Sequence, residues 1–111
     1  LQRVQLERLG YRVTVFTHSR DALEAFTAAP ENFDLLVTDM TMPGMTGDRL
    51  CTAVREIRRE VPVIICTGYS ERIDEERAAV MGVDGFLFKP VLRDEMAALV
   101  RRVLDGDGRK L

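Results

Sequence analysis

The sequence is poor in the residues that build several common kinds of functional site. Its 111 residues include no tryptophan, one histidine, His18, and two cysteines, Cys51 and Cys66. Two cysteines cannot make a disulfide framework, and one histidine beside them does not complete a usual zinc site. Both cysteines lie in apolar stretches, where a small buried hydrophobic side chain is the expected role. An intracellular, reducing compartment is the expected location.

An excess of one charge and a long apolar run are also missing. The 16 Lys and Arg residues are balanced by 18 Asp and Glu residues, which leaves a net charge of −2. This balance argues against a general affinity for nucleic acid or anionic membranes. No apolar run approaches the roughly 20 residues that a membrane span needs. The remaining composition, 46% hydrophobic and 31% charged, is that of an ordinary globular domain.

Two periodicities alternate along the chain and predict an α/β domain. Residues 1–9 resemble the end of a helix that Gly10 terminates, and Ser19 is the expected N-cap of the next helix. Strands are predicted over residues 11–16, 34–38, 62–66 and 85–88, and helices over residues 20–29, 48–60, 71–81 and 92–104. Strands that alternate with helices at this spacing indicate a parallel sheet built from βαβ crossovers.

Three polar side chains follow successive predicted strands. Asp39 ends the second strand, Thr67 ends the third and Lys89 ends the fourth. The carboxyl ends of parallel strands meet at one edge of the sheet, where ligands bind in open α/β sheets. A carboxylate, a hydroxyl and an ammonium group are therefore expected to converge there. Each residue taken singly is as well explained as a turn, strand or surface residue, and the signal is their joint placement.

This set of side chains suits few reactions. The sequence has no carboxylate pair for glycoside hydrolysis, no nucleophile-elbow pattern, and no glycine-rich loop for a dinucleotide or flavin cofactor. A lone carboxylate beside a lysine and a hydroxyl can act as a nucleophile toward phosphorus. The lysine and a metal ion would then neutralise the phosphoryl oxygens.

The loop after the second predicted strand carries a family resemblance. Its sequence, DMTMPGMTG over residues 39–47, resembles the phosphoacceptor loop of bacterial two-component response-regulator receiver domains. Thr67-Gly68 and Phe88-Lys89-Pro90 are similar to two further motifs of that family. The resemblance implies a flavodoxin-like (CheY-like) α/β fold, a parallel sheet in the order 2-1-3-4-5 with helices on both faces. Residues 1–104 would form the receiver domain and residues 105–111 a polar tail or linker remnant.

The same resemblance implies a role for each matching residue. Asp39 would take a phosphoryl group from the phosphohistidine of a histidine kinase or of a histidine phosphotransfer domain. Lys89 would pair with the phosphoryl group, and Thr67 would turn its hydroxyl toward it. Phe86 would be the aromatic residue that follows the Thr67 movement and changes the surface of the last strand and last helices. Mg²⁺ would be held by Asp39 and the backbone carbonyl of Thr41, since Mg²⁺ prefers oxygen ligands.

The sequence departs from the family at its beginning. The family has a central first strand that ends in an acidic pair of magnesium ligands, whereas Leu1 corresponds to a position inside the following helix. The expected result is a gap between residues 11–16 and 34–38. Residues preceding Leu1 could supply the strand, the gap could be filled by rearrangement or by exchange with a second copy in a homodimer, or the domain could be a degenerate receiver. The 111 residues alone are expected to bind Mg²⁺ weakly and to be phosphorylated poorly by acetyl phosphate.

The expected function is that of a phosphorylatable switch in a two-component phosphorelay. Its enzymatic activity would amount at most to its own phosphorylation and dephosphorylation. The alternative is a phosphate-independent interaction or dimerisation module with the same fold. Residues 66–71, CTGYSE, are more similar to receivers of hybrid sensor histidine kinases than to those of transcription factors.

Overall fold

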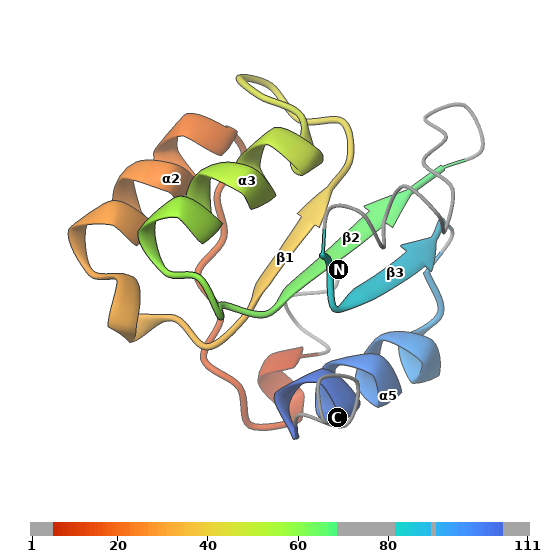
Figure 1. Ribbon diagram of the computed structural model, residues 1–111. Coiled ribbons are helices and arrows are strands. Elements are labelled where there is room, and N and C mark those ends of the chain that lie inside the picture. Colours follow the sequence, from red (N-terminus) through yellow and green to blue (C-terminus); the bar gives the residue numbers. More distant parts are fainter. Residues whose placement is uncertain (1–5, 69–81, 90, 106–111) are drawn as a thin grey trace.

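A computed structural model describes residues 6–68, 82–89 and 91–105. Its centre is a parallel sheet of three strands in the order β1-β2-β3 (Figure 1). The strands are β1 (Leu36–Asp39), β2 (Val63–Thr67) and β3 (Gly85–Phe88). Leu36 lies opposite Val63 in one ladder, and Thr67 lies opposite Phe88 in the other. The predicted parallel sheet is therefore confirmed, and the predicted strands 34–38 and 62–66 are each displaced by one or two residues.

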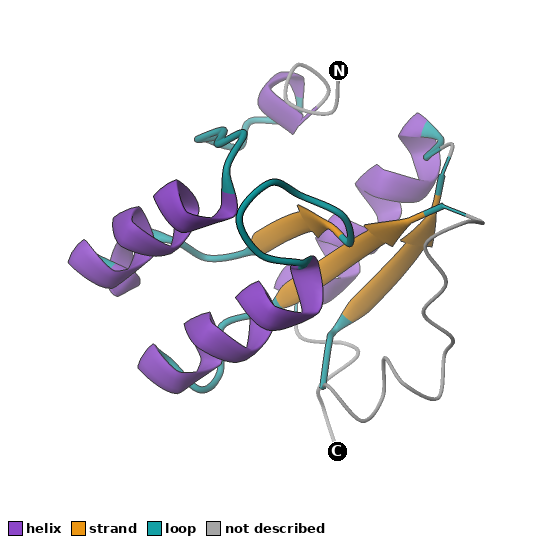
Figure 2. Cartoon of the chain, turned by 90° about the horizontal axis from the view of Figure 1, so that it is seen from above, coloured by secondary structure: helices purple, strands orange, loops and turns teal. Residues whose placement is uncertain are grey.

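Helices cover both faces of this sheet. Helices α2 (Ser19–Ala28) and α3 (Gly47–Ile57) lie on one face, and α5 (Arg93–Leu104) lies on the other (Figures 1 and 2). A short 3-10 helix, η1 (Pro30–Asn32), follows α2, and residues 6–8 form a helical turn. Gly10 follows that turn with a φ of +97°, as expected for a glycine that ends a helix. The predicted helix 71–81 lies outside the described residues.

The sheet divides the hydrophobic core into two clusters, because successive side chains of a strand point to opposite faces. One cluster packs against α5 and contains buried Leu6, Ile64, Cys66, Leu87, Met96, Leu99, Val100 and Val103. The other packs against α2 and α3 and contains buried Phe26, Leu50, Cys51, Val54, Val61, Val63 and Ile65. Every residue of β2 is buried, which explains why this strand reads as a continuous apolar run.

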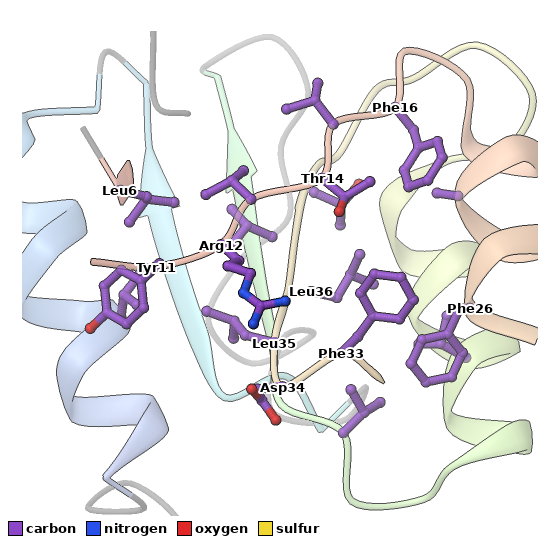
Figure 3. Close-up of a pocket in the computed structure, with 18 of the residues that line it drawn as sticks. Leu6, Tyr11, Arg12, Thr14, Phe16, Phe26, Phe33, Asp34, Leu35 and Leu36 are labelled. Carbon is purple, nitrogen blue, oxygen red and sulfur yellow. The ribbon is translucent and has the colours of Figure 1, made fainter. Parts of the chain in front are cut away.

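The strand predicted over residues 11–16 is wrong. These residues form neither a strand nor a helix, and Val15 has half of its surface exposed. A cavity of about 720 Å³ lies between this segment and β1 (Figure 3). A β-branched sequence forms a strand only when its backbone pairs with a neighbouring strand. Among the described residues, no strand pairs with residues 11–16.

Candidate functional site

The three polar side chains predicted to converge do lie at one edge of the sheet. Asp39 and Thr67 are the last residues of β1 and β2, and Lys89 follows β3 directly. The Lys89 Nζ atom lies 3.5 Å from Oδ1 of Asp39. Both side chains are partly exposed, at 38% and 46%, so the pair adds little to stability and stays accessible to solvent.

Thr67 is placed differently from its two neighbours. It is fully buried, and its hydroxyl group donates a hydrogen bond to the carbonyl oxygen of Gly68 at 3.4 Å. Its own carbonyl oxygen accepts a hydrogen bond from the backbone N–H of Lys89 at 2.7 Å. The structure therefore pairs Asp39 with Lys89 directly and links Thr67 to the Lys89 backbone.

The thiol of Cys66 lies close enough to this pair to respond to its charge. Burial raises the pKa of Cys66 to about 11, the Asp39 carboxylate contributes to the increase, and the Lys89 ammonium opposes it. Cys66 is fully buried and has no disulfide partner. A thiol with such a pKa is neutral at physiological pH and is a poor nucleophile. Cys66 therefore serves as a small core residue, as the sequence predicts.

The raised pKa of Cys66 predicts a loss of stability in alkaline solution. The folded protein keeps this proton up to about pH 11, whereas the unfolded chain releases it near the ordinary thiol pKa of 9.0. The contribution of the Cys66 thiol to the free energy of unfolding is fully present below pH 9. It is lost as the pH rises from about 9 to about 11. Thermal midpoints measured across this range should fall more steeply for the wild type than for Cys66→Ala. Equal slopes would contradict the assignment.

Two glycines let the loop that follows Asp39 fold tightly. The backbone N–H of Gly47 donates to the carbonyl oxygen of Met40 at 2.7 Å. A Cβ atom on Gly47 would lie 2.5 Å from the carbonyl oxygen of Asp39, and one on Gly44 would lie 2.5 Å from the ring of His18. Gly44 also has a φ of +102°, which favours glycine. Both glycines are therefore required by the path of the loop.

Ser19 holds the same loop from the side of α2. Its buried hydroxyl group lies 2.9 Å from the carbonyl oxygens of Pro43 and Met45, and it accepts the backbone N–H of Met45 at 2.6 Å. The Ser19 backbone N–H donates to Pro43 as well, at 3.0 Å. The prediction that Ser19 is the N-cap of α2 is wrong. The N-cap is His18, whose Nδ1 accepts the backbone N–H of Arg20, and this frees the Ser19 hydroxyl for the loop.

Replacing Ser19 by alanine is expected to loosen this loop. The change leaves the partly buried N–H of Met45 without its acceptor, at a cost of about 1 kcal/mol. Chemical denaturation should show this loss, and amide exchange should accelerate at Met45. Thr27→Ala is the matched control, because it removes another α2 hydroxyl, an exposed one that donates to the Leu23 carbonyl at 2.7 Å. Equal losses for the two variants would contradict a special role for Ser19.

A magnesium site is expected from the sequence at this edge of the sheet. They contain no group of three or more histidine, cysteine, aspartate or glutamate side chains placed to hold a metal ion. The Asp39 carboxylate and the Thr41 carbonyl are the two oxygen ligands that the sequence predicts, and Mg²⁺ requires a nearly octahedral set. These two ligands alone do not fit a tightly bound ion.

Phe86, the predicted switch aromatic, lies on β3 beside the site. It is partly buried and packs against the cluster below α2 and α3. Its ring makes an edge-to-face contact with Phe88, with ring centroids 5.0 Å apart. Phe88 lies opposite Thr67 in the sheet and is 52% exposed. Within the described residues, the aromatic pair therefore connects the end of β2 to the protein surface.

None of the helices in the described ranges has the length and apolar character to cross a membrane.

Comparison with known proteins gives one consistent result. The family model of the response regulator receiver domain matches residues 1–101. Chemotaxis protein CheY of Pseudomonas aeruginosa is 40% identical in an alignment of 98 residues, with a coverage of 79% for each chain. Sensory transduction protein RegX3 of Mycobacterium tuberculosis is 34% identical over 103 residues, 93% of this chain and 44% of the relative. The chain thus spans less than half of the length of RegX3.

Solved structures agree with the sequence comparison. A response regulator receiver domain protein from Clostridium thermocellum superposes with a TM-score of 0.87 at 26% identity, over 95% of this chain and 83% of that one. Chemotaxis protein CheY4 of Vibrio cholerae gives a TM-score of 0.78, also at 26% identity, over 91% and 84% of the two chains. One family accounts for the charged pair at the sheet edge, the loop after β1 and the parallel fold. The chain belongs to the response regulator receiver domains.

Proposed function

We propose that Asp39 is the phosphoacceptor of this receiver domain and that Lys89 is its charge partner. Membership of the family makes the domain a phosphoacceptor switch of two-component signalling. The observation that supports the choice of residues is the 3.5 Å contact between Lys89 Nζ and Asp39 Oδ1 at the accessible carboxyl edge of the sheet. The proposed donor is the phosphohistidine of a histidine kinase or histidine phosphotransfer domain.

The reaction needs one nucleophile and a nearby positive charge. A carboxylate oxygen of Asp39 attacks phosphorus, an O–P bond forms, and the N–P bond of the phosphohistidine breaks. The leaving imidazole nitrogen takes a proton from solvent. Lys89 stands where it can neutralise charge on the phosphoryl oxygens, which is the main catalytic demand of phosphoryl transfer. The Thr67 hydroxyl would exchange its bond to the Gly68 carbonyl for one to a phosphoryl oxygen.

Receiver domains bind Mg²⁺ in an acidic pocket, and the proposed ligands in this chain are the Asp39 carboxylate and the Thr41 carbonyl. The ion would neutralise phosphoryl oxygens. With two protein ligands its affinity should be low. Phosphorylation of the 111 residues by acetyl phosphate is accordingly expected to be slow and incomplete.

The proposed output runs from Thr67 through the aromatic pair. Movement of the Thr67 hydroxyl changes the space at the end of β2, opposite Phe88. Phe88 contacts Phe86, whose ring packs on the core, so a change of rotamer at either ring alters the exposed surface of β3. Such a local charge event with a distant effect is typical of phosphorylation switches. The proposed location, the bacterial cytoplasm, is supported by the two free cysteines.

The test is phosphotransfer from a phosphorylated histidine phosphotransfer domain. Intact-mass spectrometry should show one added phosphoryl group that alkali removes, and peptide mapping should place it on Asp39. A parallel titration with beryllofluoride and Mg²⁺ should raise the thermal midpoint, because a ligand of the folded state stabilises it. No label after prolonged incubation, together with no thermal shift, would instead favour a phosphate-independent interaction module.

A further inference from the structure

Methionines gather on the loop that joins β1 to α3. The sequence has five methionines, and three of them, Met40, Met42 and Met45, lie close together directly after Asp39. Figure 1 shows that this loop leaves β1 at its carboxyl end and leads into α3. Met96, by contrast, lies in α5 with only 1% of its surface exposed. The thioether groups beside Asp39 therefore have surroundings different from those of the core thioether.

The side chains of Met40 and Met45 lie between the core and the solvent. Both residues are partly buried and pack against the hydrophobic cluster under α2 and α3, which contains Leu50 and Ile65. Methionine is flexible and polarizable, so it suits the irregular space between a loop and a core. Partial exposure also leaves both residues accessible to small oxidants in solution.

Hydrogen bonds hold the backbone of these two residues in place. Met40 donates its N–H to the Cys66 carbonyl oxygen at 2.8 Å, and its own carbonyl oxygen accepts the Gly47 N–H at 2.7 Å. The Ser19 hydroxyl oxygen lies 2.6 Å from the Met45 nitrogen and 2.9 Å from the Met45 carbonyl oxygen. A modified side chain must therefore either stay against the cluster or turn toward solvent about its own torsions.

Oxidation would convert this apolar contact into a polar one. Hydrogen peroxide transfers one oxygen atom to the methionine sulfur, its O–O bond breaks, and the remainder leaves as water. The sulfur loses two electrons, and the product is the polar methionine sulfoxide. A sulfoxide that stays against the cluster buries a polar group without a partner, and one that turns outward leaves the cluster poorly packed. Either outcome weakens the contact between the loop and the core.

Met42 differs from the other two methionines of the loop. Its sulfur atom accepts a hydrogen bond from the buried Thr38 hydroxyl group at 3.2 Å, so it already contacts a polar group. A sulfoxide oxygen is also a hydrogen-bond acceptor, and Thr38 could donate to it in the same way. Oxidation of Met42 should therefore disturb the fold little, which makes this residue an internal comparison.

We propose that Met40 and Met45 form an oxidation site, at which hydrogen peroxide or a similar oxidant loosens the loop that follows Asp39. Sulfoxide formation lowers the stability of the domain. It also reduces phosphoryl uptake, because the loosened loop begins at Asp39 and contains the Thr41 carbonyl group. The second effect rests on the proposed function, and the first does not. A methionine sulfoxide reductase should reverse both effects.

The experiment treats the unmodified chain with dilute hydrogen peroxide and locates the products by peptide mass spectrometry. Met40 and Met45 should each gain one oxygen atom while Met96 stays unmodified, since the folded core shields it. The thermal midpoint should fall by about 5 °C and recover after treatment with a methionine sulfoxide reductase. Earlier oxidation of Met96, or sulfoxides at both loop residues without a thermal shift, would overturn the proposal.

Two leucine variants separate this site from other effects of peroxide. The double variant Met40→Leu/Met45→Leu keeps nearly the same apolar volume and removes both sulfur atoms. Its thermal midpoint should not respond to peroxide. Met42→Leu is the matched control and should respond as the wild type does. A double variant that stays sensitive, or protection by Met42→Leu, would also overturn the proposal.

Phosphoryl uptake is measured on the same samples. The oxidised wild type should take up less phosphoryl group than the reduced protein, and the double variant should show no difference. A thermal shift with unchanged uptake would overturn the effect on signalling and leave the oxidation site in place. Absence of uptake in both states would count against the proposed function of Asp39, and the thermal shift would then decide on the oxidation site alone.

Discussion

Asp39→Asn is expected to reduce phosphoryl uptake to below about one hundredth of the wild-type yield, since it removes the nucleophile that we propose. Asparagine has nearly the same size and keeps one side-chain oxygen, so the fold should be retained. The amide nitrogen cannot form the acyl phosphate, and the pair with Lys89 loses its negative charge. Intact-mass spectrometry after incubation with a phosphorylated histidine phosphotransfer domain measures the effect directly, even where the wild type is labelled slowly.

The control for this variant is Asp34→Asn. Asp34 is an exposed aspartate just before β1, at the opposite end of the strand from Asp39. It undergoes the same chemical change and the same loss of charge. Phosphoryl uptake by Asp34→Asn should equal that of the wild type. If Asp39→Asn were labelled as well as the control, another side chain would be the phosphoacceptor, and the role proposed for Asp39 would be lost.

The second large effect is expected from Gly47→Ala. The added methyl group would meet the Asp39 carbonyl oxygen at 2.5 Å and the Met40 Cα atom at 3.1 Å. Both are backbone atoms, so the contact can be relieved only by moving α3 or the end of β1. Overpacking of this kind costs about 1–3 kcal/mol, which corresponds to a fall in the thermal midpoint of roughly 10 °C. Phosphoryl uptake should fall too, because the displaced backbone carries the Asp39 side chain.

Gly10→Ala provides the comparison for this variant. Gly10 has a φ of +97°, and a Cβ atom there would have no neighbour within 4 Å. The expected cost is the left-handed backbone penalty of about 1–2 kcal/mol, with no effect on phosphoryl uptake. A Gly47→Ala variant that loses stability but labels at the wild-type rate would show that the tight turn serves the fold alone.

The sequence was sufficient to predict the elements that depend on a short local pattern of residues. The strand over residues 85–88 was predicted with the bounds that the structure shows, because a short β-branched or aromatic run with flanking breakers needs no knowledge of its neighbours. The meeting of Asp39 and Lys89 followed from topology, since carboxyl ends of parallel strands share an edge.

The predictions that failed concern residues whose structure depends on groups distant in the chain. Residues 11–16 have strong strand propensity but no partner at pairing distance among the described residues, so tertiary context overrode the local preference. Ser19 was predicted as a cap because its hydroxyl suits that role, yet the loop at residues 43–45 uses that hydroxyl and His18 caps the helix instead. No pattern within the sequence alone couples a serine to a loop 24 residues away.

The complete burial of β2 has a practical consequence for experiments. Ile64 and Ile65 are adjacent in the chain, yet one belongs to the cluster under α5 and the other to the cluster under α2 and α3. Their methyl groups are two internal reporters that differ in layer but share a strand and full burial. Selective isotope labelling of isoleucine would therefore record in one NMR spectrum which layer rearranges when the domain is phosphorylated.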